Sequence, residues 1–150
     1  MKTVINYILT ILLISSLIGC NRQIKGNEKE VKDIVIQLCQ KELKNNLVSE
    51  TFWSEKRLHS YPLGTYEILK ERTGDVTAKY IIDKVDSIYN SFDIKVEDIR
   101  IIKLDKDANN VSCNAKLYLN EKESFNLIYN AQLTTDNDKV YVELIKFERN

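Results

Sequence analysis

The chain has few of the residues that catalytic and metal sites use. It contains one histidine and three cysteines in 150 residues, and it lacks the paired Cys and His spacing of a structural zinc site. Its formal net charge is zero, with 22 Lys and Arg against 22 Asp and Glu interspersed along the sequence. Such a balance excludes the basic footprint of a nucleic-acid-binding protein. We therefore expect no nucleic-acid partner, no metal and no cofactor.

Long apolar runs are also missing, except at the very start. Lys2 precedes an apolar run from Val4 to Ile18, which the residues Leu17-Ile18-Gly19-Cys20 close. A positive start, a short apolar stretch and a small residue before the cysteine form the layout of a cleavable secretory signal. A spanning helix needs about 20 apolar residues, and this run is shorter and interrupted by polar residues. The alternatives are an uncleaved membrane helix or a plain secretory signal.

The Leu17-Ile18-Gly19-Cys20 motif resembles the lipobox of bacterial lipoproteins, which signal peptidase II cleaves before the cysteine. The resemblance implies that residues 1–19 are a signal peptide and that Cys20 is lipidated by palmitate and becomes the mature N-terminus. Acyl chains would then anchor the protein, since each buried methylene contributes about 0.8 kcal/mol. In the sorting pattern of Gram-negative lipoproteins, Asn21 in place of Asp points to the periplasmic face of the outer membrane.

A polar segment follows the cysteine. Residues 21–30, NRQIKGNEKE, have almost nothing to bury, so we expect residues 20–30 to be the lipidated cysteine and a polar tether. Ten extended residues reach about 35 Å at most, which keeps the folded part near its membrane. Residues 31–150 are enough for one core and too few for two, so they are predicted to form a single α+β periplasmic domain.

Helical periodicity opens this domain. Apolar residues fall three and four apart at Val31, Ile34, Val35, Leu38, Cys39 and Leu43. This spacing predicts an amphipathic helix that ends near Asn45, and Ser49 can cap a short second helix. After a break at Pro62 we expect a helix over 65–72 and another that is capped by Asp75.

After residue 93 the apolar period changes to two, which indicates strands. Alternating stretches occur near 99–104, 111–119, 125–133 and 140–144, with turns at 105–110 and 135–138. Each strand then has one apolar face that only the upstream helices can cover. The predicted fold is α+β, with N-terminal amphipathic helices packed on a curved four-stranded antiparallel meander. In element order it resembles cystatin-like or NTF2-like domains.

Residues 93–147 also resemble a group of small, uncharacterised envelope lipoproteins. The likeness rests on the Ile-Arg-Ile-Ile strand, the Asp105-Lys106-Asp107 turn and Ser112-Cys113-Asn114-Ala115. It implies no activity.

Two cysteines remain once Cys20 is assigned to lipid. Cys39 lies on the apolar side of the first helix and Cys113 on the apolar side of the second strand, so the sequence predicts a disulfide across the helix–sheet interface. The alternative is two separate buried thiols that behave as small apolar side chains. A count of reactive thiols in the denatured, non-reduced protein distinguishes them.

No set of residues forms a convincing catalytic site. His59 is the only histidine, and we interpret it as a surface residue. The pairs Asp83 with Asp86 and Glu97 with Asp98 fit solvated edges as well as acid–base partners. The stretch 105–109 resembles a calcium loop, but it lacks the glycine at the sharp turn and the glutamate at the twelfth position, so we interpret it as a hairpin turn.

Three aromatic residues gather around the break before the third predicted helix: Phe52, Trp53 and Tyr61. We expect them to fold back onto the domain, and the alternative is a partner-binding patch. The leading functional hypothesis is a non-enzymatic, membrane-anchored module that binds another envelope protein or an incoming protein. A small-ligand-binding or hydrolytic cone-shaped domain and a structural envelope accessory are the alternatives.

Overall fold

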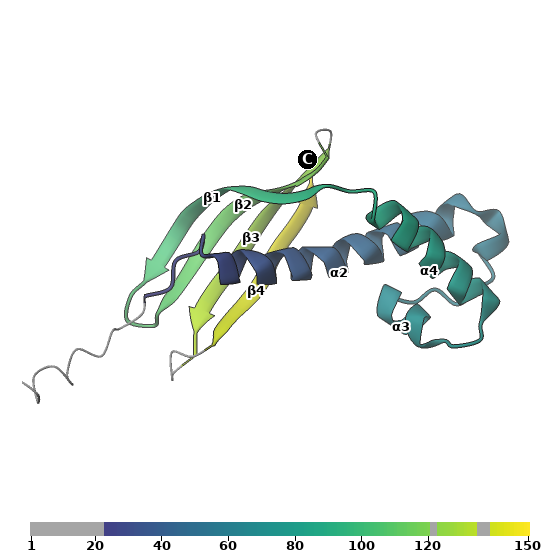
Figure 1. The fold of residues 1–150 in the computed structure, drawn as a ribbon, viewed down its shortest axis with the longest axis horizontal. Coiled ribbons are helices and arrows are strands. Elements are labelled where there is room, and N and C mark those ends of the chain that lie inside the picture. Colours follow the sequence, from purple (N-terminus) through teal and green to yellow (C-terminus); the bar gives the residue numbers. More distant parts are fainter. Residues whose placement is uncertain (1–22, 121–122, 135–138) are drawn as a thin grey trace, which may run out of the picture.

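The computed structural model describes residues 23–120, 123–134 and 139–150. The signal, Cys20 and the turn predicted at 135–138 lie outside these residues. Helices come first along the chain and four strands follow, as predicted (Figure 1). The elements are α2 (Lys29–Ser54), η1 (Lys56–Leu58), α3 (Tyr66–Glu71), α4 (Val76–Tyr89), β1 (Ile94–Asp105), β2 (Asn110–Leu119), β3 (Glu123–Leu133) and β4 (Val140–Arg149).

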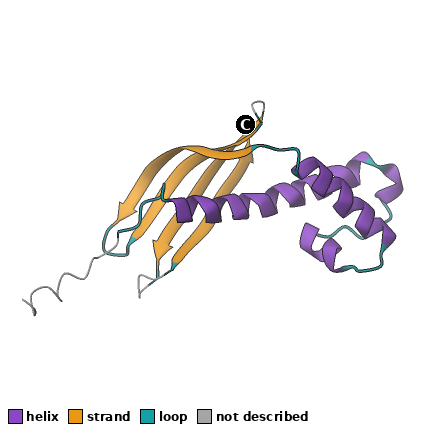
Figure 2. Cartoon of the chain, in the orientation of Figure 1, coloured by secondary structure: helices purple, strands orange, loops and turns teal. Residues whose placement is uncertain are grey.

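The four strands form one antiparallel sheet in the order β1-β2-β3-β4, which confirms the predicted meander. The sheet is curved, and α2 crosses one of its faces (Figure 2). Side chains that face the helix are buried along β2 and β3, and their polar neighbours point to the other face. The alternation read from the sequence therefore reflects one covered face and one solvated face, and the α+β class is confirmed.

Helix α2 connects two separate hydrophobic cores. Its 26 residues make a rod about 39 Å long. Its first half packs on the sheet through Val31, Val35, Cys39 and Leu43. Its last turns pack on α3 and α4 through Leu47, Val48 and Phe52. We call residues 47–89 the helical head, since they surround this second core beside the end of the sheet where β1 begins (Figure 1).

The predicted end of the first helix near Asn45 is wrong, and so is the separate helix capped by Ser49. Helix α2 runs unbroken through both residues to Ser54. The Asn45 side-chain oxygen accepts a hydrogen bond of 3.0 Å from the backbone N–H of Tyr66, the first residue of α3. A tertiary contact therefore satisfies the polar group that, in isolation, favours a helix end.

The two later helices begin as predicted. Asp75 caps α4, because its carboxylate accepts hydrogen bonds from the backbone N–H groups of Thr77 at 2.9 Å and Ala78 at 3.0 Å. Thr65 caps α3 in the same way by accepting from the N–H of Ile68. These caps satisfy helix N–H groups that have no partner inside the helix.

The segment before α2 belongs to the folded body, which corrects the prediction of a tether up to residue 30. Ile24 is buried, and its N–H donates to the Asn109 side chain at 3.0 Å. The Tyr129 hydroxyl donates to the Gly26 carbonyl at 2.8 Å. Gly26 lies so close to Cys113 that a Cβ there would collide with the sulfur. The segment is mostly polar, but burial of Ile24 and the close approach of Gly26 are sufficient to hold it against the sheet.

Strand β1 departs from the predicted alternation. It is an edge strand whose pairing with β2 shifts between Glu97 and Arg100, and again between Ile101 and Lys103. Asp98, inside the first irregularity, has a φ of 53°, a left-handed conformation that Asp tolerates better than most residues. These bulges break the period of two, and the strand is exposed from Arg100 to its end.

Candidate functional site

The helical head lies at the far end of the molecule from the point where the described chain begins (Figure 1). Strand β1 starts beside the head, with four residues between it and the end of α4, and its other end adjoins the hairpin that holds Ile24. The head carries the most exposed large apolar side chains of the described residues. Val76 is 82% exposed and Trp53 is 66% exposed.

The three aromatic residues Phe52, Trp53 and Tyr61, which we expected to fold back onto the domain, behave differently from one another. Phe52 is buried in the core of the head, and Trp53 is exposed with its ring edge against Phe52 at 5.1 Å between centroids. Tyr61 is half-buried, and its hydroxyl donates to the Asp75 carboxylate at 2.7 Å. Phe52 and Tyr61 therefore fold back onto the domain as expected, whereas the Trp53 side chain is exposed at the surface.

His59 extends the aromatic surface around Trp53. It is exposed, as expected, and its ring centroid lies 5.5 Å from that of Trp53. Its Nε2 atom lies 3.4 Å from the Trp53 carbonyl oxygen. Ring contacts with Phe52 and His59 give Trp53 a defined position, which is what a preorganised binding residue requires.

A groove of about 370 Å³, open to solvent, lies beside η1. Its lining comes from η1, the following loop and the start of α4: Arg57, Leu58, Ser60, Tyr61, Pro62, Val76, Thr77 and Tyr80. The Arg57 guanidinium stacks over the Tyr80 ring at 4.3 Å from its centroid. A lining of mixed polar and apolar side chains with one stacked cation suits an extended segment of another protein better than a small anion.

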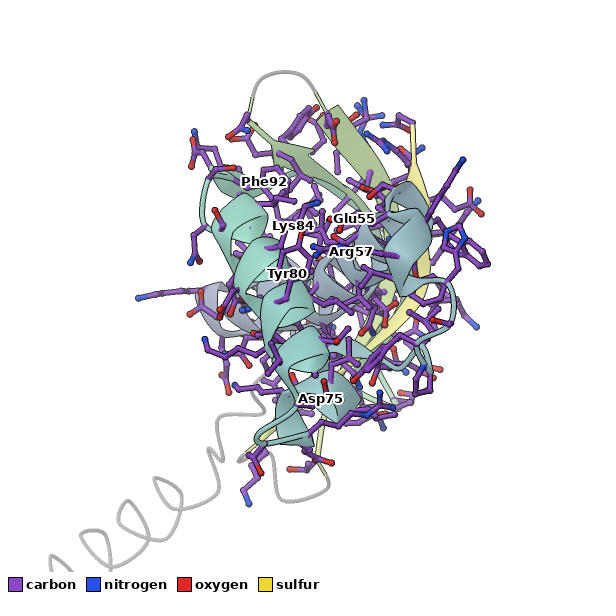
Figure 3. All side chains as sticks on the ribbon, turned by 90° about the vertical axis from the view of Figure 1, so that its right-hand side faces the viewer. Glu55, Arg57, Asp75, Tyr80, Lys84 and Phe92 are labelled. Atoms are coloured by element: carbon purple, nitrogen blue, oxygen red, sulfur yellow. The ribbon has the colours of Figure 1, made fainter. Side chains whose placement is uncertain are left out.

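A set of hydrogen-bonded residues centred on Glu55 includes two residues of the groove lining, Arg57 and Tyr80. Figure 3 shows these side chains converging at the end of α2. Glu55 accepts hydrogen bonds from Lys84 at 2.6 Å, Tyr80 at 2.7 Å and Arg57 at 2.8 Å. Its pKa falls to about 2, chiefly because Lys84 and then Tyr80 and Arg57 hydrogen-bond to the carboxylate. Glu55 thereby fixes η1 and α4 relative to α2.

A second charged cluster lies between the three helices of the head. The Lys44 ammonium from α2 donates to Asp86 of α4 at 2.7 Å and to the Tyr66 hydroxyl of α3 at 3.1 Å. Tyr66 in turn donates to Asp86 at 2.8 Å. Burial pushes the Asp86 pKa upward, but the hydrogen bonds from Lys44 and Tyr66 outweigh burial and hold the pKa below its usual value. Every member is paired, so the cluster sets the geometry of the head.

The two cysteines are buried, and both are free thiols, so the bridge predicted between Cys39 and Cys113 is not formed in the structure. Cys113 contacts Gly26 ahead of the helix, whereas Cys39 lies ten residues inside α2, about 15 Å along its axis. Burial and, to a smaller extent, Glu42 raise the pKa of Cys39 to about 12. Burial also raises the pKa of Cys113, so neither sulfur is a thiolate near neutral pH.

The remaining carboxylates considered as acid–base partners have other roles. Asp83 pairs with Lys79 on the exposed side of α4 and Asp86 with Lys44, so the two aspartates do not share a site. Asp98 accepts a hydrogen bond from the Tyr118 hydroxyl at 3.0 Å. Among the described residues, no three His, Cys, Asp or Glu side chains gather in a group that could hold a metal ion.

The acidic stretch 105–109 is a hairpin turn, as predicted. The Asp105 carboxylate accepts from the backbone N–H groups of Asp107 at 3.1 Å and Ala108 at 2.9 Å, which is an Asx turn rather than a cation loop. Asn109 completes the turn with a φ of 49°.

The sequence interpretation missed Glu55, Arg57 and Val76, which shape or support the groove. Glu55 and its partner Lys84 are 29 residues apart, so no local pattern connects them. Val76 directly follows the predicted cap Asp75, and this place at the first position of a helix was the one signal available in the sequence. Its exposure is known only from the structure.

None of the helices that the structure describes is long and apolar enough to span a membrane. A comparison of the chain with protein-family models, with curated proteins and with solved structures gave no match.

Proposed function

We propose that the protein is a membrane-anchored periplasmic lipoprotein whose helical head binds another protein, either a component of the envelope or one that arrives from outside. The anchor is proposed from the resemblance of Leu17-Ile18-Gly19-Cys20 to a lipobox. The binding role is proposed from one observation, the exposure of Trp53 and an open groove on the helical head, at the end of the molecule opposite the start of the described chain (Figure 1).

Tryptophan is enriched among the residues that dominate the binding free energy at protein interfaces. Its contribution is large when a partner buries the side chain fully. Trp53 leaves two-thirds of its surface to solvent while Phe52 and His59 hold its ring. A monomeric protein gains nothing from this exposure, because burial of apolar surface is worth about 25 cal/mol per Å². A partner that covers Trp53 and the groove recovers this free energy.

The alternative of a ligand pocket in the concave face of the sheet is less well supported. Helix α2 occupies that face, and Leu117, Leu127 and Tyr129 are fully buried beneath it. A ligand there would have to displace Val35 and Cys39 of the helix. The open surface of the head requires no such displacement.

The binding role is tested by chemical crosslinking in intact cells that carry the full-length chain, followed by purification from solubilised membranes. We expect one dominant crosslinked partner with the wild type and a strong loss of it with Trp53→Ala. Tyr141→Ala is the matched control, because Tyr141 is an aromatic residue of similar exposure on β4. Equal crosslinking by both variants, or recovery of no envelope protein with the wild type, would contradict the proposal.

The anchor is tested separately by growth with labelled palmitate. We expect label in the wild-type protein and none in Cys20→Ser, which should also remain uncleaved. A Cys20→Ser protein that matures and sediments with membranes as the wild type does would refute the anchor and leave the crosslinking result standing.

A further inference from the structure

The end of strand β1 carries an apolar patch that no helix covers. Ile101 is 57% exposed, Ile102 is 59% exposed and Leu104 is 40% exposed. The register places Ile101 opposite Cys113 and Leu104 opposite Val111, so both belong to the apolar face of the sheet. Ile102 is the extra residue of the second bulge. We call these three residues the β1 patch.

The β1 patch lies beside the point where the chain enters the folded body. Leu104 pairs with Val111, and Val111 lies next to Gly26, with its Cγ1 3.7 Å from the position of a Cβ on that glycine. One turn further, Asn109 accepts the hydrogen bond from Ile24. The patch, the β1–β2 turn and the first described residues therefore share one end of the molecule, which Figure 1 also shows.

Very little chain separates this end from the proposed lipid. Gln23 is the first described residue, three positions after Cys20. Three extended residues reach about 10 Å, which is far less than the ten-residue tether expected from composition. An acyl group on Cys20 must enter the bilayer, so Gln23 and the neighbouring sheet end stay within about 10 Å of the lipid surface.

From these distances we infer that the β1 patch rests on the lipid bilayer that holds the acylated Cys20. This inference rests on the proposed anchor and adds an orientation to it. Ile101, Ile102 and Leu104 enter the boundary between headgroups and acyl chains, where burial of apolar surface is favourable. The exposed cations of Arg100 and Lys103 lie on the other face of the same edge strand, because they pair with Asn114 and Ser112.

A second copy of the chain is the competing occupant, because an exposed edge strand can pair with another strand. The geometry of β1 disfavours it. Two register shifts within the strand interrupt the row of backbone groups that a second strand would bind, and Lys103 stands between the apolar residues. Bulges and edge lysines are devices by which sheets avoid such pairing. A bilayer forms no backbone hydrogen-bond ladder with the strand, so the register shifts of β1 do not disfavour contact with lipid.

The test places a fluorophore on the patch of the full-length, lipidated protein. In Ile102→Cys the new thiol is exposed while Cys39 and Cys113 are buried, so a thiol-reactive bimane labels the folded protein at one site. The protein is reconstituted into vesicles of phosphatidylethanolamine and phosphatidylglycerol, with or without doxyl groups on the acyl chains. We expect the label at position 102 to lose most of its emission in the doxyl vesicles. Leu104→Cys should behave in the same way.

The matched control is Val76→Cys, an exposed aliphatic position in the head, whose label should keep its emission. If the label at 102 is quenched no more than the label at 76 while palmitate incorporation is normal, the orientation is refuted and the anchor stands. Disulfide-linked dimers of unlabelled Ile102→Cys, together with no quenching of the labelled protein, would assign the patch to a second copy instead. Absence of palmitate would refute the anchor, and the orientation would fall with it.

Discussion

Lys44 shows how single residues fix the arrangement of the head. Its side chain is 13% exposed, so its ammonium depends on partners to replace the water it has lost. Asp86 and Tyr66 supply them from two other helices, and the rings of Tyr66 and Tyr89 flank the charge at 4.3 and 4.9 Å. A charge satisfied from several elements specifies their relative position more than it adds stability.

Replacing Asp86 tests how far the stability of the head depends on pairing the Lys44 charge. Asp86→Asn keeps the shape of the side chain but leaves the Lys44 charge unpaired, and we expect a loss of about 1–2 kcal/mol in the free energy of unfolding. The figure is at the low end because Asp86 is 36% exposed and water screens the pair. Urea denaturation measures it. Asp83→Asn on the same helix breaks the exposed pair with Lys79, and its effect should stay below about 0.5 kcal/mol.

The cysteines give a second prediction at this scale. Because Cys39 and Cys113 contact different neighbours and carry free thiols, we expect two alkylated cysteines when the mature protein is denatured without reductant. Before denaturation we expect neither to react, since both are buried. Mass spectrometry counts the alkyl groups on residues other than Cys20. A denatured protein that takes up no alkyl group would establish the bridge predicted from the sequence.

Local residue roles could be predicted from the sequence and distant ones could not. The Asp75 cap involves Thr77 and Ala78, two and three residues away, so the pattern of a polar residue before an apolar run was sufficient. The pairing of Glu55 with Lys84 depends on how α2 and α4 meet, which no spacing in the sequence encodes. The exposure of Trp53 likewise depends on which side of α2 the head packs.

At the scale of elements, strands could be predicted from local residues, whereas helix ends that depend on distant contacts could not. One-sided alternation located β2 and β3 because each needs only its own residues to define a face. The continuation of α2 past Asn45 was missed because a contact from α3 decides it. The exposure of β1 was missed because bulges shift the register, although four apolar residues between 99 and 104 already departed from strict alternation.

The docking of the segment before α2 is testable through its glycine. Gly26→Ala places a methyl group against the Cys113 sulfur, and we expect it to lift the segment and to cost about 1–3 kcal/mol of unfolding free energy. Cys113→Ala removes the sulfur, so in the double variant the added methyl should cost much less than it does alone. Lys25→Ala, at an exposed position in the same segment, is the control. Additive effects in the double variant would contradict the proposed contact.

The head should also respond to acid through Glu55. Its folded pKa of about 2 lies below the ordinary unfolded value of about 4.3. A lowered pKa contributes stability that is complete above the unfolded value and is lost as the pH falls toward the folded one. We therefore expect Glu55→Gln to lower the melting temperature at neutral pH, and the difference from wild type to vanish between about pH 4.3 and pH 2.

Thermal melts over this pH range measure the difference between the two proteins. Glu71→Gln, which alters an exposed carboxylate of the same head, serves as the control. A deficit of Glu55→Gln that stays constant down to pH 2 would show that shape, rather than the charge of Glu55, stabilises the contact between α2 and α4.

For the whole molecule, α2 determines how the two ends can divide their work. Over its length of about 39 Å it packs first on the core of the sheet and then on the core of the head. The sheet end carries Ile24 and the β1 patch, and the head carries Trp53 and the groove. Under the proposed lipid anchor, a short connection to lipid at one end presents the other end to the periplasm, where the proposed protein partner has access.

This division makes a last prediction about Trp53, the only tryptophan in the chain and therefore a natural fluorescent probe. In vesicles that carry the full-length lipidated protein, we expect aqueous acrylamide to quench its emission, because its side chain is 66% exposed. We expect brominated acyl chains to leave that emission unchanged, because the head stands away from the bilayer by about the length of α2. The same lipidated protein in detergent micelles gives the reference for acrylamide. Quenching of Trp53 by brominated lipid would mean that the head lies on the membrane, and the aromatic surface would then be a lipid contact in place of a protein-binding one.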